Sequence, residues 1–211
     1  DGTFLVDLAE GKKLLPDPPI ASIGYQASIV ITPQQEADID IKATLNNLLI
    51  PYTSNYAGTL LPGIREYTVT PGEKTTTISG KGKAGLKQEE NYYFFYLPVC
   101  YKGITGKSYA YYNTSRSKNL YLPASVDENY SYDIQLPENL TLCTPIQEKK
   151  IDNPIGSFKI TLTSEGSSLH IELALQIKKQ LITPAEYPAF RSLITEWTDR
   201  TRKPILFKTV Q

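Results

Sequence analysis

The chain has 211 residues and carries 22 lysines and arginines against 22 aspartates and glutamates, so its net charge is close to zero. This balance disfavours nucleic acid and membrane surfaces as partners, because both normally attract an excess of positive charge. The length suffices to bury a hydrophobic core without disulfides or metals. We find neither an apolar run approaching the roughly 20 residues of a membrane helix nor a signal-peptide pattern. The absence of methionine leads us to expect a processed or excised piece.

The first residues combine a short strand pattern with a proline-rich connector. Alternation over residues 4–8 predicts a strand with Asp7 near its end. Residues 12–22, KKLLPDPPIAS, hold three prolines and no periodicity, so we expect an extended connector there. We therefore assign residues 1–22 to the end of a preceding unit and its linker, and residues 23–211 to a separate domain.

Most of the remaining sequence carries strand signals. Residues 37–45, ADIDIKATL, and 168–179, SLHIELALQIKK, alternate cleanly between apolar and polar side chains, which predicts half-buried strands. Further strand-like segments are residues 25–31, 64–69, 74–79, 92–100, 130–136, 157–164 and 205–210. Turn signals separate these segments at the short spacing typical of a sandwich. We therefore predict a mainly β fold, an antiparallel β-sandwich.

Two neighbouring segments depart from simple alternation. Residues 81–91, KGKAGLKQEEN, are polar and contain glycine, and this predicts a subdomain boundary or a long loop. Residues 92–100, YYFFYLPVC, are apolar on both faces, which favours a central strand covered on both sides.

One segment has helical periodicity, residues 183–197, TPAEYPAFRSLITEW. Thr183 and Glu186 have the spacing of a capping box, with Pro184 at the first helical position. A helix starting at Pro184 would lose its first internal hydrogen bond at Pro188, and a start one residue later avoids this. The apolar face predicts a short structural helix on a sheet or at an open end of the sandwich; it comprises Tyr187, Phe190, Leu193, Ile194 and Trp197.

Catalytic and metal-binding signals are weak. His170 is the sole histidine and falls on the polar side of its strand, so a surface role is favoured. Any Ser-His-Asp or Cys-His arrangement would need His170, and no serine or cysteine lies in an elbow motif. Paired carboxylates such as Asp38 and Asp40 indicate a solvated strand face. We expect no metal and no cofactor, because neither ligand spacing nor a phosphate-binding loop is present.

Cys100 and Cys143 lie 43 positions apart (143 − 100), each after an apolar, strand-like run. They predict either a disulfide, which would contribute about 4 kcal/mol in the chain-entropy model, or two buried free thiols.

Tyrosines are concentrated in one region, since eight of fifteen fall between residues 92 and 121. On an exposed β face such rings stack on sugars or on a protein partner. Ordinary strand composition is the alternative explanation, because tyrosine favours sheets. The candidate binding residues are Tyr92, Tyr93, Tyr96, Tyr101, Tyr109, Tyr111 and Tyr112, and Tyr121 completes the cluster.

Residues 1–11, DGTFLVDLAEG, resemble the last strand of a transglutaminase-like core, where a glycine-bearing turn leads into a strand ending in the triad aspartate. The segments YDIQLPENLTLCTP and GSFKITLTSEGSSLHIELALQIKKQLITPAEYPAFRSLITEW resemble the C-terminal β region of large bacterial transglutaminase-like proteins with a papain-like core, typical of Bacteroidetes. The resemblance maps Asp7 to the orienting carboxylate of a Cys-His-Asp triad. The family motif continues with a small hydroxyl residue, whereas this chain continues with Leu8.

The resemblance implies a non-catalytic accessory β domain, because the triad cysteine and histidine would lie upstream and Cys100 and Cys143 match neither. Its partners would be the upstream catalytic core of the same protein and a protein, peptide or glycan, in the periplasm or outside the cell. One alternative is an independent carbohydrate-binding module that uses the tyrosines of residues 92–121. Another is an enzyme centred on His170, which predicts a pocket at that strand.

Overall fold

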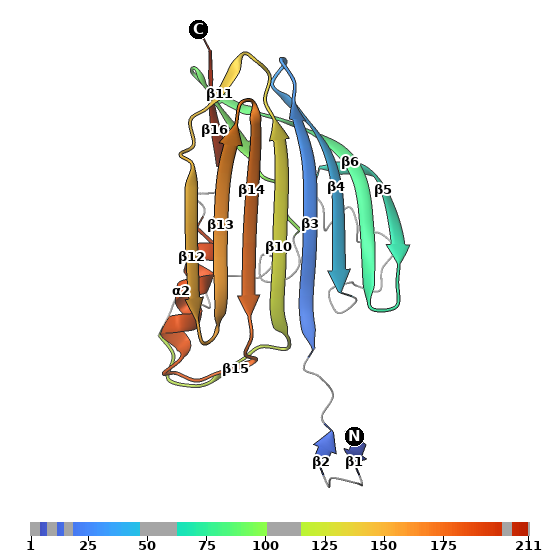
Figure 1. Cartoon of the computed structure of the whole chain (residues 1–211), viewed down its shortest axis with the longest axis vertical. Helices are drawn as coiled ribbons and strands as arrows, with labels where there is room; N and C mark the ends of the chain where they lie inside the picture. Colours follow the sequence, from blue (N-terminus) through green and yellow to red (C-terminus); the bar gives the residue numbers. More distant parts are fainter. Residues whose placement is uncertain are drawn as a thin grey trace.

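The computed structural model describes the backbone of residues 5–7 and 12–14, and residues 19–46, 63–100, 115–199 and 204–210 in full. Figure 1 shows the elements, which in chain order are β1 (Leu5–Asp7), β2 (Lys12–Leu14), β3 (Ile20–Ile31), β4 (Glu36–Asn46), β5 (Ile64–Pro71), β6 (Thr75–Gly85), β7 (Lys87–Glu89), β8 (Tyr92–Tyr96), β9 (Leu120–Tyr121), β10 (Ser125–Gln135), β11 (Leu140–Leu142), β12 (Gln147–Asn153), β13 (Gly156–Glu165), β14 (Ser168–Ile177), β15 (Leu181–Ile182), α2 (Tyr187–Trp197) and β16 (Pro204–Thr209). The predicted mainly β fold is confirmed.

A large sheet dominates the molecule, with eight strands in the order β12-β13-β14-β10-β3-β4-β6-β5. Neighbouring strands are antiparallel except β10 and β3, which run parallel with Tyr130 opposite Tyr25. Two antiparallel halves therefore meet at one parallel seam. The strands alternate between buried and exposed residues because only one face of the sheet is covered.

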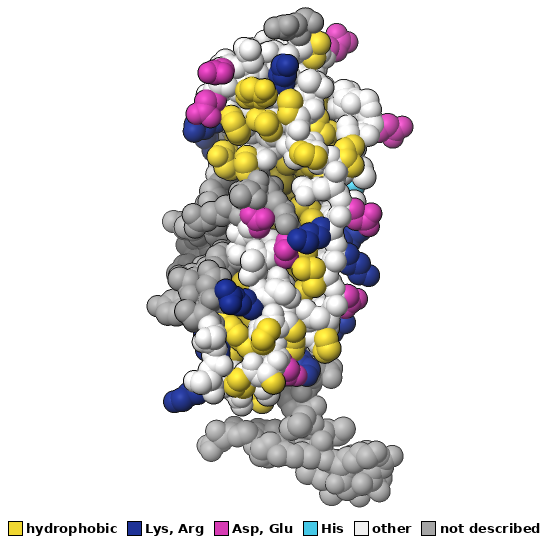
Figure 2. Space-filling model, turned by 90° about the vertical axis from the view of Figure 1, so that its left-hand side faces the viewer, with side chains coloured by type: hydrophobic (Ala, Val, Ile, Leu, Met, Phe, Trp, Pro, Cys, Tyr) yellow, Lys and Arg dark blue, Asp and Glu magenta, His cyan; other side chains and the backbone are white. Residues whose placement is uncertain are grey.

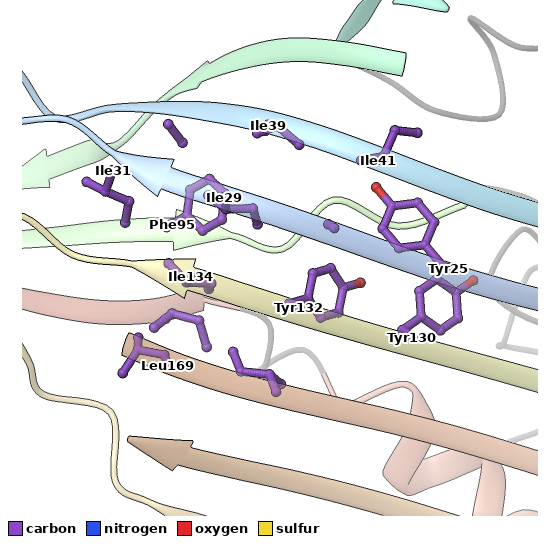
Figure 3. Close-up of a cluster of buried hydrophobic side chains, with 14 of the residues drawn as sticks. Tyr25, Ile29, Ile31, Ile39, Ile41, Phe95, Tyr130, Tyr132, Ile134 and Leu169 are labelled. Atoms are coloured by element: carbon purple, nitrogen blue, oxygen red, sulfur yellow. The ribbon is translucent and has the colours of Figure 1, made fainter. Parts of the chain in front are cut away.

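A small antiparallel sheet, in the order β11-β16-β8-β7, covers part of the inner face of the large one. Phe95 of β8 and Phe207 of β16 are buried in the same cluster as Ile29 of β3 and Ile134 of β10. Figure 3 shows Phe95 among the isoleucines of the large sheet. Burying each of these large side chains contributes roughly 1.5–3 kcal/mol, and the two sheets therefore form the predicted sandwich.

Three tyrosines belong to this hydrophobic core. The ring centroid of Tyr25 lies 5.4 Å from that of Tyr130 and 5.8 Å from that of Tyr132 (Figure 3). The Tyr132 hydroxyl donates a hydrogen bond to the Pro98 carbonyl oxygen at 2.7 Å. Burial raises the pKa of Tyr25 and of Tyr132, because the phenolate would lose its hydration. Tyr132 thus connects the large sheet to the segment that follows β8, and the three buried rings are not available to a ligand on the surface.

Helix α2 packs on β13 and β14, toward the other end of the large sheet from β11 and β16 (Figure 1). Its buried residues Phe190 and Leu193 join Phe158 and Leu175 in a second hydrophobic cluster. Trp197 contacts both clusters and so connects the two parts of the core. The predicted apolar face of the helix is confirmed, and α2 is the one helix in the described residues.

The start of α2 differs from the predicted start. The helix begins at Tyr187, and Pro188 falls in its first turn, where no internal bond needs its missing N–H. The Glu186 carboxylate accepts hydrogen bonds from the Thr183 N–H at 3.0 Å and the Thr183 hydroxyl at 2.9 Å. The capping-box pair therefore stabilises the turn that precedes the helix. Lys179 and Thr183 lower the pKa of Glu186 to about 2 by hydrogen bonding to its carboxylate.

Of the two alternatives for residues 81–91, the long loop is wrong, and the subdomain boundary stays a prediction. Lys81 and Lys83 belong to β6, and β7 follows directly. The segment is polar because the outer face of this sheet is solvated: Lys83 Nζ lies 3.0 Å from Asp38, and Lys81 Nζ lies 3.7 Å from Asp40. The paired carboxylates thus lie on a solvated face, as predicted.

The connector predicted for residues 12–22 is also partly wrong. β2 pairs with β1 in a hairpin that places Leu5 opposite Leu14 and Asp7 opposite Lys12. β3 begins at Ile20, before the predicted start of the domain. In Figure 1 the hairpin lies beyond one end of the large sheet. The division between residues 1–22 and 23–211 stays a prediction.

The structure distinguishes between the two alternatives for the cysteines. Cys100 and Cys143 are free thiols, the first buried and the second half-buried. Cys100 packs in the hydrophobic core between the two sheets, where a free cysteine behaves as a small apolar side chain.

Candidate binding surface

Strand β8 exposes aromatic side chains on the face that points away from the large sheet. Tyr93 and Phe95 point into the hydrophobic core, whereas Tyr92 is 40% and Tyr96 is 58% exposed. Phe94 lies between these two tyrosines and is half-buried. The expectation of a strand covered on both faces is therefore wrong, because the described residues cover only its inner face.

Strand β16 extends this exposed face. Pro204 lies opposite Tyr96, Leu206 opposite Phe94, and Lys208 opposite Tyr92. Directly opposite residues of antiparallel strands share one face of a sheet. The six side chains form a continuous surface, here called the β8–β16 face, comprising Tyr92, Phe94, Tyr96, Pro204, Leu206 and Lys208.

The β8–β16 face has an apolar centre and a charged rim. On the other side of β8, Lys87 lies opposite Phe94 and Glu89 opposite Tyr92. On the other side of β16, Thr141 lies opposite Lys208. Aromatic and aliphatic side chains framed by charged ones are typical of surfaces that contact other proteins.

The predicted tyrosine cluster is divided between several environments. Tyr92 and Tyr96 belong to the β8–β16 face, but Tyr93 is 6% exposed and is part of the hydrophobic core. Tyr121 is exposed on β9, in a separate pair with β15. The remaining candidates lie outside the described residues, namely Tyr101, Tyr109, Tyr111 and Tyr112. Sequence reasoning missed Pro204 and Leu206, although alternation with the buried Ile205 and Phe207 marks them as the other face of a strand.

His170 lies on the outer face of the large sheet, half-exposed as predicted. Its Nδ1 is 2.7 Å from Asp133 Oδ1, and its Nε2 is 3.5 Å from Glu172 Oε1. Glu172 also accepts a hydrogen bond from Lys159 at 2.9 Å. A hollow of about 630 Å³ on the outer face of the large sheet adjoins His170 and Thr163.

The orientation of His170 does not suit general-base chemistry. Both ring nitrogens face carboxylates, so neither is positioned to accept a proton from a nearby hydroxyl. Ser28 lies opposite Asp133 across the parallel seam, on the side away from the imidazole. The aspartate therefore lies between the serine and the histidine, whereas in a catalytic triad the histidine lies in the middle. His170 is best understood as a member of a charged network on a solvated face. In the residues that the structure describes, no group of three metal-binding side chains is assembled.

This network predicts a pH-dependent contribution to folding. The hydrogen bond to Asp133 raises the pKa of His170 above 6.5. Its stabilisation is therefore complete below the unfolded pKa and is lost as pH rises through the folded pKa. We expect His170→Gln to lower the free energy of unfolding by about 0.5 kcal/mol at about pH 5.5, and by less at about pH 8.5. Urea unfolding of both proteins at the two pH values measures this, and an equal loss at both would contradict it.

Asp7 lies in β1, and its backbone pairs with Lys12 of β2. No helix in the described part of the chain is long and apolar enough to cross a membrane.

Comparison with known proteins gives a family and a larger relative. A family model described as a domain of unknown function with a solved structure, DUF3858, matches residues 91–207. The chain is similar to a crystal structure named "putative protease" from Parabacteroides distasonis, with 31% sequence identity and a TM-score of 0.52. The match covers 58% of this chain and 24% of that one, so a little over half of this chain corresponds to about a quarter of that protein. No curated protein matches the chain.

Proposed function

We infer that this chain, which belongs to the DUF3858 family, is a non-catalytic accessory domain of a larger protease-type protein and packs on its catalytic core through the β8–β16 face. The similarity to a 24% portion of the Parabacteroides distasonis protein carries this proposal. The remainder of that protein is long enough to hold a separate catalytic core. The family match includes β8 and most of β16, so the proposed surface belongs to the family segment.

The composition of the β8–β16 face favours a protein partner. Phe94 and Leu206 at its centre offer no hydrogen bonds, whereas sugar-binding sites combine aromatic rings with polar side chains that bind hydroxyls. A carbohydrate-binding module is the second candidate, because Tyr92 and Tyr96 expose two rings on one face of β8. Both candidates use the same surface and differ in the ligand.

Three finer parts of the proposal come from the resemblance in sequence. The catalytic core would be transglutaminase-like, with a papain-like arrangement of cysteine and histidine upstream of residue 1. Asp7 would be the orienting carboxylate of that triad. The protein would act in the periplasm or outside the cell.

The proposal is tested by binding and by turnover. We expect the separately expressed catalytic core of the longer protein to bind this chain in calorimetry. Tyr96→Asp should weaken binding at least about tenfold, because it places a charge beside the apolar centre of the face. The chain alone should show no turnover of peptide or amine-donor substrates above buffer.

The matched control is Val30→Asp, which introduces the same charge at a residue that is 48% exposed on the large sheet. Equal binding by the two variants would reject the β8–β16 face. Binding of a glycan array that Tyr96→Asp abolishes would favour the carbohydrate module instead. Turnover that disappears with His170→Ala would contradict a non-catalytic domain.

A further inference from the structure

A groove of about 480 Å³ lies beside α2, between the helix, strand β12 and residues 115–116. It lies on elements other than β8 and β16, so it is separate from the surface described above. Figure 2 shows hydrophobic side chains gathered at both ends of this side of the molecule, with charged side chains between them. The lining residues that matter here are Arg116, Ile151, Tyr187, Pro188, Arg191 and Glu196.

Two arginines give the groove a positive character. The guanidinium carbon of Arg116 lies 5.5 Å from the centroid of the Tyr187 ring, a cation–π distance. Tyr187 is 3% exposed and packs against Phe190, so this contact holds Arg116 on a rigid wall. Arg191 is exposed and lies one helical turn after Tyr187, which places a second guanidinium along the same groove.

The carboxylate that lines the groove does not cancel these charges. Glu196 Oε1 lies 2.6 Å from Lys149 Nζ, and this ion pair joins α2 to β12. The lining of the groove therefore holds two arginines and one carboxylate, and that carboxylate is paired with a lysine. Between them lie apolar side chains, Ile151 and Pro188 among them.

We propose that this groove binds an extended peptide segment that carries glutamate or aspartate next to apolar side chains. Arginine pairs with carboxylates through two parallel hydrogen bonds, which gives both affinity and orientation. The apolar walls would accept the neighbouring side chains of such a peptide. The charge complementarity is local, because the whole chain has equal numbers of basic and acidic residues. A long polyanion such as nucleic acid would require a larger basic surface.

The test uses two fluorescein-labelled pentapeptides, Glu-Leu-Glu-Leu-Glu and its uncharged counterpart Gln-Leu-Gln-Leu-Gln. In fluorescence anisotropy we expect the acidic peptide to bind at least about tenfold more tightly, and to lose affinity as salt is raised. Arg191→Gln should remove most of this difference. Amide shifts in the NMR spectrum should fall on residues 187–196 and 149–151.

The matched control is Arg65→Gln, which removes an exposed arginine of β5 far along the sheet order from β12. Equal affinity for the two peptides, or equal effects of the two variants, would overturn the proposal. Displacement by inorganic phosphate beyond that by sodium chloride of equal ionic strength would also overturn it, since the site would then be a simple anion site. None of these outcomes depends on binding to a catalytic core, so this test and that of the proposed function can fail separately.

Discussion

Replacing Trp197 by alanine should lower the free energy of unfolding by about 3 kcal/mol, near the lower end of the range for truncating packed aromatic side chains. The Trp197 ring lies 5.8 Å from the Tyr130 ring and 6.5 Å from the Phe158 ring, and the second contact is edge-to-face. It packs against both hydrophobic clusters. Its removal would leave a cavity where α2, the seam strand β10 and strand β13 meet.

Circular dichroism measures this loss, and a Tm about 6–12 °C lower is expected for a chain of this size. The control is Tyr121→Ala, which truncates an aromatic ring that is 68% exposed and should change stability by less than about 0.5 kcal/mol. Phe190→Ala gives an independent check, because Phe190 is 0% exposed and the sole tryptophan then remains as a fluorescent probe. If Trp197→Ala unfolded at the same temperature as Tyr121→Ala, a structural role for the end of α2 would be excluded.

The strands and the helix could be predicted where one side of the element faces solvent. In β4 the exposed Asp38 and Asp40 alternate with the buried Ile39 and Ile41. The alternation of polar and apolar residues in the sequence therefore follows the alternation of exposed and buried positions in the strand. The same argument located the buried face of α2. It failed at the end of β6, where Gly80 and Gly82 occupy two successive inward-facing positions in place of apolar side chains. A Cβ at Gly82 would lie 2.4 Å from the Gly63 carbonyl oxygen and 3.0 Å from the Ile64 side chain. The close approach of the chain at the start of β5 therefore leaves no room for an apolar side chain at this position.

The candidate surface could be predicted only in part, because it depends on pairing between distant strands. Tyr96 and Pro204 are 108 positions apart (204 − 96) and meet only when β8 pairs with β16. The sequence also could not separate tyrosines by environment: Tyr92 is exposed and Tyr93 is buried although they are adjacent. Local composition carries no information about which strand lies beside which. Tyrosine suits both a core and a surface, since its ring is apolar and its hydroxyl is polar.

The hairpin between β12 and β13 attaches the edge of the large sheet to the helix. Asn153 Oδ1 accepts hydrogen bonds from the N–H groups of Ile155 at 2.9 Å and Gly156 at 3.3 Å. Asn153 Nδ2 donates to the Ala189 carbonyl oxygen in α2 at 3.0 Å. The Asn153 side chain therefore closes the turn and also contacts the helix. Gly156 follows this turn as the first residue of β13.

Gly156→Ala should destabilise the chain by at least about 3 kcal/mol, the upper end of the usual range for overpacking. A Cβ at this position would lie 1.8 Å from the Gln176 carbonyl oxygen and 3.1 Å from the Ile177 Cα. Both atoms belong to the backbone of β14, so no change of side-chain rotamer can relieve the clash. The start of β13 would have to separate from β14, which would break the pairing of Gly156 with Ile177 and shift the turn that Asn153 holds against α2.

Urea unfolding measures this effect, with Gly85→Ala as the matched control. Gly85 lies in β6 with nothing within 4 Å of its added Cβ and without a positive φ, so alanine there should be neutral or stabilising by up to about 1 kcal/mol. The two variants make the same chemical change in a strand and differ in the space available. Similar midpoints for both would mean that β13 and β14 can separate locally at little cost. The close approach at Gly156 would then not be what fixes the register of the hairpin beneath α2.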